Sequence, residues 1–120
     1  MATFSKTILS GSTDGRGIKV AATATAGTLI HTGSATATTL DEVWLYAVNT
    51  SASDVKLTIE WGGVTAPDDL IEYTVKAENG LYLIVAGGII KGNATPLVVR
   101  AFAATANVIV VHGYVNQITA

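Results

Sequence analysis

The apolar residues of this chain recur at every second position within short runs, and this spacing constrains the fold more than any other feature. The clearest run covers residues 55–61. Its odd positions are all apolar: Val55, Leu57, Ile59 and Trp61. Its even positions are all polar: Lys56, Thr58 and Glu60. Because side chains alternate between the two faces of a strand, this run predicts a half-buried strand with its polar side in solvent.

Four further runs are largely apolar at both odd and even positions: 42–49, 81–86, 97–103 and 108–115. Helical spacing of apolar residues never extends over a useful length, so no helix is expected to cover the second face of these strands. We therefore expect another subunit to cover it. Five aromatic residues in these runs are the expected core or subunit-interface anchors: Trp44, Tyr46, Tyr82, Phe102 and Tyr114.

Turn signals separate the runs and predict an all-β fold. Asp14-Gly15 and Asn79-Gly80 are dipeptides typical of tight turns. About eight strands joined by such turns predict a single-domain antiparallel β-sandwich that is jelly-roll-like. An immunoglobulin-like sandwich is the alternative, but the chain has no cysteine and so lacks the Cys…Trp…Cys spacing of that fold. We expect residues 1–12 to form an N-terminal arm or a first edge strand, and residues 13–120 to form the sandwich domain.

Composition excludes several classes of protein. The 120 residues suit one domain, and a hydrophobic fraction of 49% excludes a disordered chain. Only 13% of the residues are charged, against roughly 25% in an average domain, and the net charge of −2 excludes a basic nucleic-acid-binding surface. The longest uncharged apolar run, 81–90, is about half of the ~20 residues that a membrane helix needs. No signal peptide is expected, and the lack of cysteine is typical of the cytoplasm.

Few residues suggest catalysis or metal binding. His31 and His112 lie in apolar surroundings, where a histidine usually belongs to the core or to an interface. A small hydrolase with either as its base would need a carboxylate or hydroxyl beside the imidazole. Asp68, Asp69 and Glu72 are close in sequence, but they lack the spacing of a calcium loop and match ordinary turn composition. We therefore predict a non-enzymatic protein without a catalytic, cofactor or metal site.

Four segments give the chain a family resemblance. They are SGSTDGRGIKVA at 10–21, DEVWLYAVNT at 41–50, LTIEWGG at 57–63, and RAFAATANV at 100–108 continuing to HGYVN at 112–116. Together they resemble small virion structural proteins of tailed bacteriophages, in particular the capsid decoration (cement) class. The resemblance covers nearly the whole chain, and its motifs are structural rather than catalytic.

The resemblance implies a function and partners. Decoration proteins are β-rich, often trimeric, and lie on the outside of the phage head, where they stabilise the shell. We therefore expect a homotrimer that binds the major capsid protein, is found on the head surface of the virion and assembles in the host cytoplasm, with no nucleic-acid or membrane partner. The alternative is a carbohydrate-binding or host-contact module on a tail or fibre, with Trp61 at a strand end as the exposed sugar platform.

Overall fold

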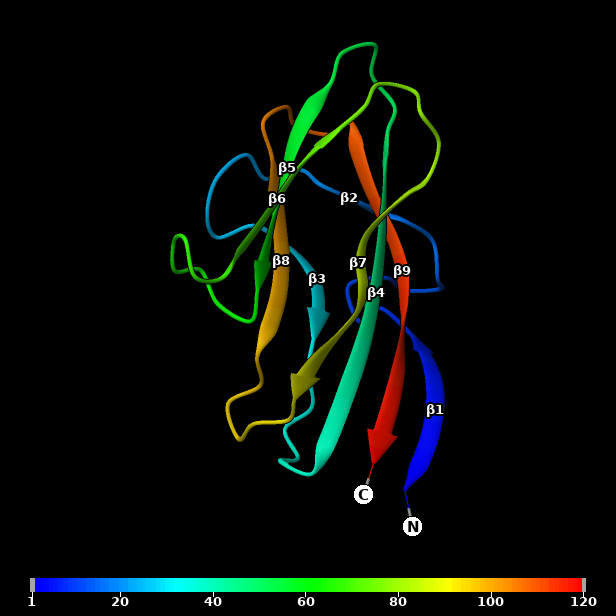
Figure 1. The fold of residues 1–120 in the computed structure, drawn as a ribbon, viewed down its shortest axis with the longest axis vertical. Helices are drawn as coiled ribbons and strands as arrows, with labels where there is room; N and C mark the ends of the chain where they lie inside the picture. The colour runs from blue at the N-terminus through cyan, green and yellow to red at the C-terminus, as the bar shows by residue number, and fades with distance from the viewer. Residues whose placement is uncertain (1, 120) are drawn as a thin grey trace.

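The computed structural model describes residues 2–119 and shows nine β-strands in two antiparallel sheets, with no helix in this range (Figure 1). The strands are β1 (Thr3–Ile8), β2 (Ile18–Lys19), β3 (Thr28–Thr32), β4 (Thr39–Asn49), β5 (Val55–Trp61), β6 (Leu70–Val75), β7 (Tyr82–Lys91), β8 (Val98–Ala103) and β9 (Ile109–Thr119). The prediction of an all-β, single-domain antiparallel sandwich is confirmed. Over the same residues, no helix is long and apolar enough to cross a membrane.

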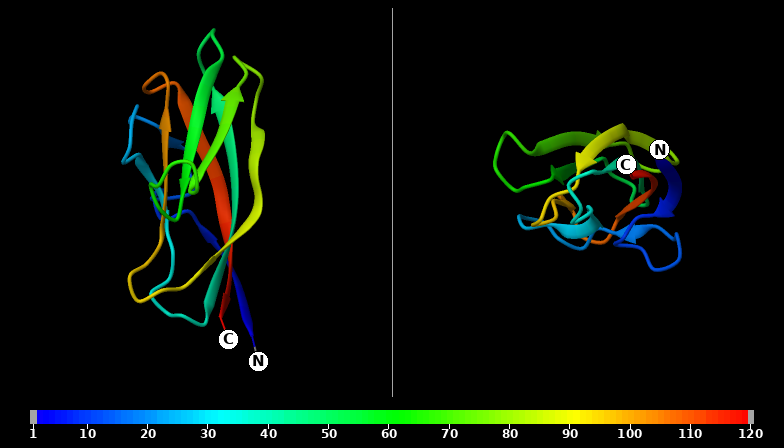
Figure 2. Two further views of the ribbon diagram at one scale, coloured as in Figure 1. Left: turned by 60° about the vertical axis from the view of Figure 1, so that its left-hand side comes forward. Right: turned by 90° about the horizontal axis from the view of Figure 1, so that it is seen from below.

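The strands pair like one long hairpin that is folded over on itself. Sheet A has the order β1-β9-β4-β7, with β2 also beside β9, and sheet B has the order β3-β8-β5-β6. The antiparallel pairs β2–β9, β3–β8, β4–β7 and β5–β6 are nested in the sequence. Nested pairing across two facing sheets gives the jelly-roll-like arrangement that the sequence predicts. Figure 2 shows the two sheets as facing layers.

The ninth strand arises because the first strand of the sandwich is interrupted. β1 pairs with the C-terminal part of β9, and β2 pairs with its N-terminal part, so β1 and β2 lie along one edge of sheet A. The loop between them contains the expected Asp14-Gly15 turn, in which Gly15 has a φ of 93°. Within the 1–12 segment, the structure therefore has an edge strand, β1.

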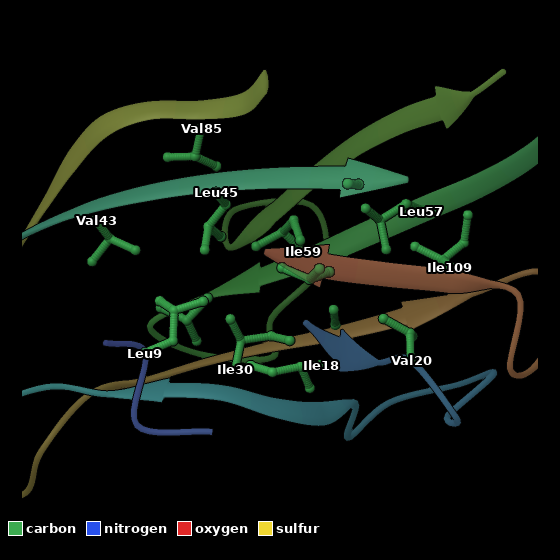
Figure 3. Packing of buried hydrophobic residues seen from close by; sticks show 14 of the residues in the cluster. Leu9, Ile18, Val20, Ile30, Val43, Leu45, Leu57, Ile59, Val85 and Ile109 are labelled. Atoms are coloured by element: carbon green, nitrogen blue, oxygen red, sulfur yellow. The ribbon is translucent and has the colours of Figure 1, made fainter. Parts of the chain in front are cut away.

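The core lies between the sheets and is aliphatic (Figure 3). Its fully buried members from sheet A include Val43, Leu45 and Ile109, and those from sheet B include Ile30, Leu57 and Ile59. Val55 is also buried, and Trp61 is partly buried against the core, so the predicted apolar face of β5 is confirmed.

The opposite face of β5 corrects the prediction of a solvated side. Lys56 is exposed, but Thr58 is 2% exposed and Glu60 is fully buried. The cause is the segment 22–27, which folds over the outside of sheet B. Glu60 accepts hydrogen bonds from the Gly27 N–H, at 2.7 Å, and from the Thr25 hydroxyl. The alternation of residue types could not reveal this covering segment, because it comes from a distant part of the chain.

Candidate functional site

The outward side chains of β4 and β9 form an aromatic face at the centre of sheet A. Register places Trp44 opposite Tyr114, Tyr46 opposite His112, and Glu42 opposite Asn116. Residues directly opposite in an antiparallel pair share a face. The intervening residues Val43, Leu45 and Ala47 are completely buried, so these six point away from the core. We call Glu42, Trp44, Tyr46, His112, Tyr114 and Asn116 the aromatic face; all six are half-buried in the isolated chain.

The indole of Trp44 is held in one position on this face. It covers Gly87 of β7, where an added Cβ would lie only 3.1–3.4 Å from three indole atoms. Gly87 has a φ of 74° beside a register shift in β7, a backbone conformation that suits glycine. The Trp44 Nε1–H donates to Glu42 Oε1 at 2.8 Å, and the ring lies nearly parallel to Tyr114, with an interplanar angle of 9°. The platform is therefore rigid before any ligand arrives.

Charged and polar groups border the platform. Asn116 Nδ2 donates to Glu42 Oε1 at 2.8 Å, and Lys6 Nζ lies 4.8 Å from the centroid of the Tyr114 ring. The hydrogen bond from Trp44, followed by that from Asn116, lowers the pKa of Glu42 below its ordinary value of 4.5. Next to these groups is a surface hollow of about 350 Å³, lined by Phe4, Ser5, Lys6, Glu42, Asn116 and Ile118.

Both edges of sheet A expose large apolar side chains. On β1, Phe4 is 72% exposed and Ile8 is 44% exposed. On β7, at the opposite edge, Leu83 and Ile89 are 41% and 49% exposed. Register puts all four on the same side of the sheet as the aromatic face. The sequence did not single out these four apolar residues, because their exposure depends on which strands are at the edges.

The five predicted interface aromatics are only partly brought together. Trp44, Tyr46 and Tyr114 share the aromatic face. Tyr82 is the first residue of β7 and packs against Tyr73 of β6, with ring centroids 4.8 Å apart. Phe102 lies on the outside of sheet B, opposite Thr58.

Trp61, the sugar platform suggested by the sequence, points inward. It pairs with the fully buried Val99, and its ring covers Gly88, whose added Cβ would lie 2.7 Å from the indole. The accessible aromatic platform of this chain is therefore provided by Trp44, on the preceding strand, β4. Alternation within β4 was the available signal, since it separates Trp44 from the buried Val43 and Leu45.

His31 belongs to a buried polar network that joins the two sheets. Its Nε2 lies 2.8 Å from Asp41 Oδ2, and its Nδ1 accepts the backbone N–H of Ser10 at 3.1 Å. Because Ser10 can only donate there, His31 is in the Nε2–H tautomer and donates to Asp41. Gln117 Nε2 donates to Asp41 Oδ1 at 3.0 Å. Asp41 is 1% exposed, so this carboxylate at the start of β4 is buried.

This network has the carboxylate neighbour that a hydrolase would need, but its geometry does not suit a general base. Both ring nitrogens of His31 are engaged within the protein, and its side chain is only 7% exposed. The Ser10 hydroxyl accepts from the Thr32 N–H at 2.6 Å, away from the imidazole. No nucleophile or substrate hydroxyl can reach a free nitrogen here, so the arrangement is one of a buried structural histidine.

The acidic residues 68, 69 and 72 do not converge. Asp69 Oδ2 accepts the Thr65 N–H at 3.0 Å and stabilises the loop before β6, while Glu72 pairs with Lys56 at 3.1 Å. Among residues 2–119, no group of three His, Cys, Asp or Glu side chains is placed to hold a metal ion.

Comparisons with protein-family models, with curated proteins and with solved structures give no match to this chain.

Proposed function

We propose that this chain is a non-enzymatic structural protein of a phage virion, a capsid decoration protein that assembles as a homotrimer and binds the outer shell of the head. The observation that supports this proposal most is the exposure of apolar side chains at both edges of sheet A. Phe4 and Ile8 lie at one edge, and Leu83 and Ile89 lie at the other. Exposed apolar groups concentrated in this way are typical of protein interaction sites.

The placement of these residues favours a ring. Two different edges can meet only head to tail, and such a heterologous contact closes into a ring when the rotation allows it. Three copies is the number that the resemblance to decoration proteins implies. The charged fraction of 13% is consistent with apolar contacts between copies and with the shell. Several contacts from one ring add avidity, so each contact with the shell can be weak.

Light scattering on the purified chain tests the ring. Two double variants are compared with the parent chain, each with two lysine substitutions at one edge of sheet A. We expect the parent chain to be a trimer, and both the Phe4→Lys/Ile8→Lys and the Leu83→Lys/Ile89→Lys variants to be monomers. A mixture of the two variants should form a dimer, because one intact edge of each kind remains and the ring cannot close. Leu29→Lys, at an apolar site on sheet B that is 38% exposed, close to the 41% of Leu83, is the matched control and should stay trimeric.

Two results would contradict this arrangement. A parent chain that stays monomeric at every concentration would exclude self-assembly, and a β7-edge variant that persists as a dimer would indicate a symmetric β1–β1 contact instead.

Co-sedimentation with shells of the major capsid protein tests the location. The parent chain should pellet with the shells and raise the temperature at which they break, whereas the edge variants should bind much more weakly. Shells that do not retain the parent chain would exclude decoration.

A further inference from the structure

We infer that the centre of the aromatic face is a saccharide-binding site, in which the Trp44 indole stacks on a neutral pyranose ring. This goes beyond the proposed structural function, and the site is centred on the middle of sheet A, with Lys6 of the edge strand β1 beside it. A pyranose presents one face of C–H groups and a rim of hydroxyl groups. It is therefore complementary to an exposed aromatic plane that is bordered by hydrogen-bonding groups.

The first observation for this site is the orientation of Trp44. One side of the indole covers Gly87, and the side chain as a whole is half-buried, so part of the ring remains accessible from the outer side of the sheet. A side chain at position 87 would displace the ring, and only glycine leaves room for it to lie this close to β7. The Tyr114 ring is stacked nearly parallel to the indole, 6.1 Å away between centroids, so a second aromatic ring adjoins the first.

The second observation is that the platform is already ordered. The hydrogen bond from Nε1 to Glu42 uses the polar end of the indole, and the contact with Gly87 fixes its plane. A ligand that stacks on this ring does not have to immobilise it, which removes part of the entropic cost of binding. A tryptophan that only shielded apolar surface from water would not need both the hydrogen bond to Glu42 and the close contact with Gly87.

The third observation is the position of the polar groups. Within residues 2–119, both hydrogen bonds that Glu42 accepts end on Oε1, so Oε2 is available to a sugar hydroxyl. Lys6 and Asn116 line the hollow beside the platform together with Glu42. These groups can donate to and accept from the rim hydroxyls of a neighbouring sugar unit, so the site suits an oligosaccharide rather than a single sugar.

The charges favour a neutral ligand. Glu42 is at the centre of the site, and its pKa is lowered, so the carboxylate is ionised at neutral pH. The Lys6 ammonium lines the same hollow and offsets this charge, so the site has no net charge that would select an ionic ligand. The large apolar side chains at the edges have no polar partners of their own, whereas the Trp44 indole at the centre is hydrogen-bonded to Glu42. An aromatic ring bordered by polar groups suits a sugar better than a purely apolar contact does.

Electrophoresis of the full chain in native gels containing soluble polysaccharides tests the inference. The probes are hydroxyethylcellulose, galactomannan and dextran as neutral polymers, and alginate as an acidic one. We expect at least one neutral polymer to retard the parent chain and alginate to have no effect. Trp44→Ala should weaken binding about tenfold or more, and Trp44→Phe, which keeps an aromatic ring, should retain part of it. Phe102→Ala, on the outside of sheet B, is the matched control and should bind like the parent.

Light scattering on the same variants separates this site from the proposed ring. Trp44→Ala should keep the oligomeric state of the parent, because the residue is on β4, inside the sheet, and the exposed apolar side chains of β1 and β7 are unchanged. The inference is overturned if no neutral polymer retards the parent chain, or if Trp44→Ala binds as the parent does. A Trp44→Ala variant that loses self-association while no polymer binds would identify the face as a contact between copies.

Discussion

At the scale of single residues, the carboxylate of Asp41 is the polar group that most directly connects the two layers. It comes from β4 of sheet A and receives hydrogen bonds from His31 of sheet B and from Gln117 of β9. A register shift in β3 allows two consecutive residues, Ile30 and His31, to be buried. Every buried polar side-chain atom among the described residues has a hydrogen-bond partner, so the network is complete.

Replacing this carboxylate by an amide should destabilise the fold without altering its shape. In Asp41→Asn, the new NH₂ group meets a donor, either His31 Nε2–H or the Gln117 amide, and leaves it unpaired in the interior. We expect a loss of about 1–3 kcal/mol in the free energy of unfolding, measured by urea denaturation. Asp14→Asn removes an exposed ion pair with Arg16 and should change stability by less than about 0.5 kcal/mol. Equal effects of the two substitutions would show that burial does not strengthen the Asp41 network.

At the scale of elements, the segment 22–27 covers Glu60 on the outer side of β5, the side that the sequence predicts to face solvent. Glu60 accepts from two groups of this segment, and Arg100 Nη1 donates to the Gly27 carbonyl at 3.3 Å. Gly27 itself lies against Ala101, where an added Cβ would be 2.5 Å from the backbone. Glycine therefore permits the segment to approach β8, and Glu60 then fixes it.

Removing the Glu60 side chain should release this segment while the sandwich remains folded. In Glu60→Ala, the Gly27 N–H loses its acceptor, and we expect a loss of about 1–3 kcal/mol in stability. Amide hydrogen exchange should accelerate in residues 22–27 far more than in β4 or β9. Lys56→Ala changes the same face of β5 at an exposed site and should leave exchange in the segment unchanged. Uniform acceleration over the whole chain would contradict a local role for Glu60.

Elements also show which parts of this molecule could be predicted from sequence. The alternation in 55–61 and the two-sided runs located β4, β5, β8 and β9, since a period of two depends only on local backbone geometry. It could not give the register between β4 and β7, which brings Trp44 to Gly87, or the packing of one sheet on the other, which brings Asp41 to His31. Those contacts depend on how separate strands are arranged in space. The same limit explains why Trp61, rather than Trp44, was expected to be the exposed aromatic ring.

At the scale of the whole molecule, the nested pairing brings the two ends of the described chain together. Thr3 pairs with Thr119, and the N- and C-terminal strands lie side by side at one end of the sandwich (Figure 1). The innermost pair, β5–β6, is at the opposite end of this nesting. The exposed edge formed by β1 therefore depends on β9, a strand from the other end of the described residues, so assembly through this edge requires β9 to be in place.

The charge distribution of the whole molecule makes stability sensitive to acid. The pKa of Asp54 is lowered from its ordinary value of 3.8, first by the backbone N–H of Ala77 and then by Lys76, and that of Glu42 is lowered from 4.5 by Trp44 and Asn116. At pH values between the lowered and the ordinary pKa of these carboxyl groups, the unfolded chain binds more protons than the folded one. The stabilisation from both carboxylates is therefore complete above their ordinary pKa values, and it is lost as the pH falls through the lowered ones.

Urea denaturation from about pH 6 to about pH 3 should show this loss as a falling midpoint. The double variant Glu42→Gln/Asp54→Asn removes both titrations, so its midpoint should fall less steeply than that of the parent over the same interval. Carboxyl NMR titration of the folded parent checks the cause directly, since both groups should titrate below their ordinary values of 4.5 and 3.8. A double variant that loses stability as steeply as the parent would assign the acid sensitivity to other carboxylates.

Retained saccharide binding by the parent chain just below pH 4.5 would follow from the same lowered pKa of Glu42, because the carboxylate beside Trp44 stays ionised there.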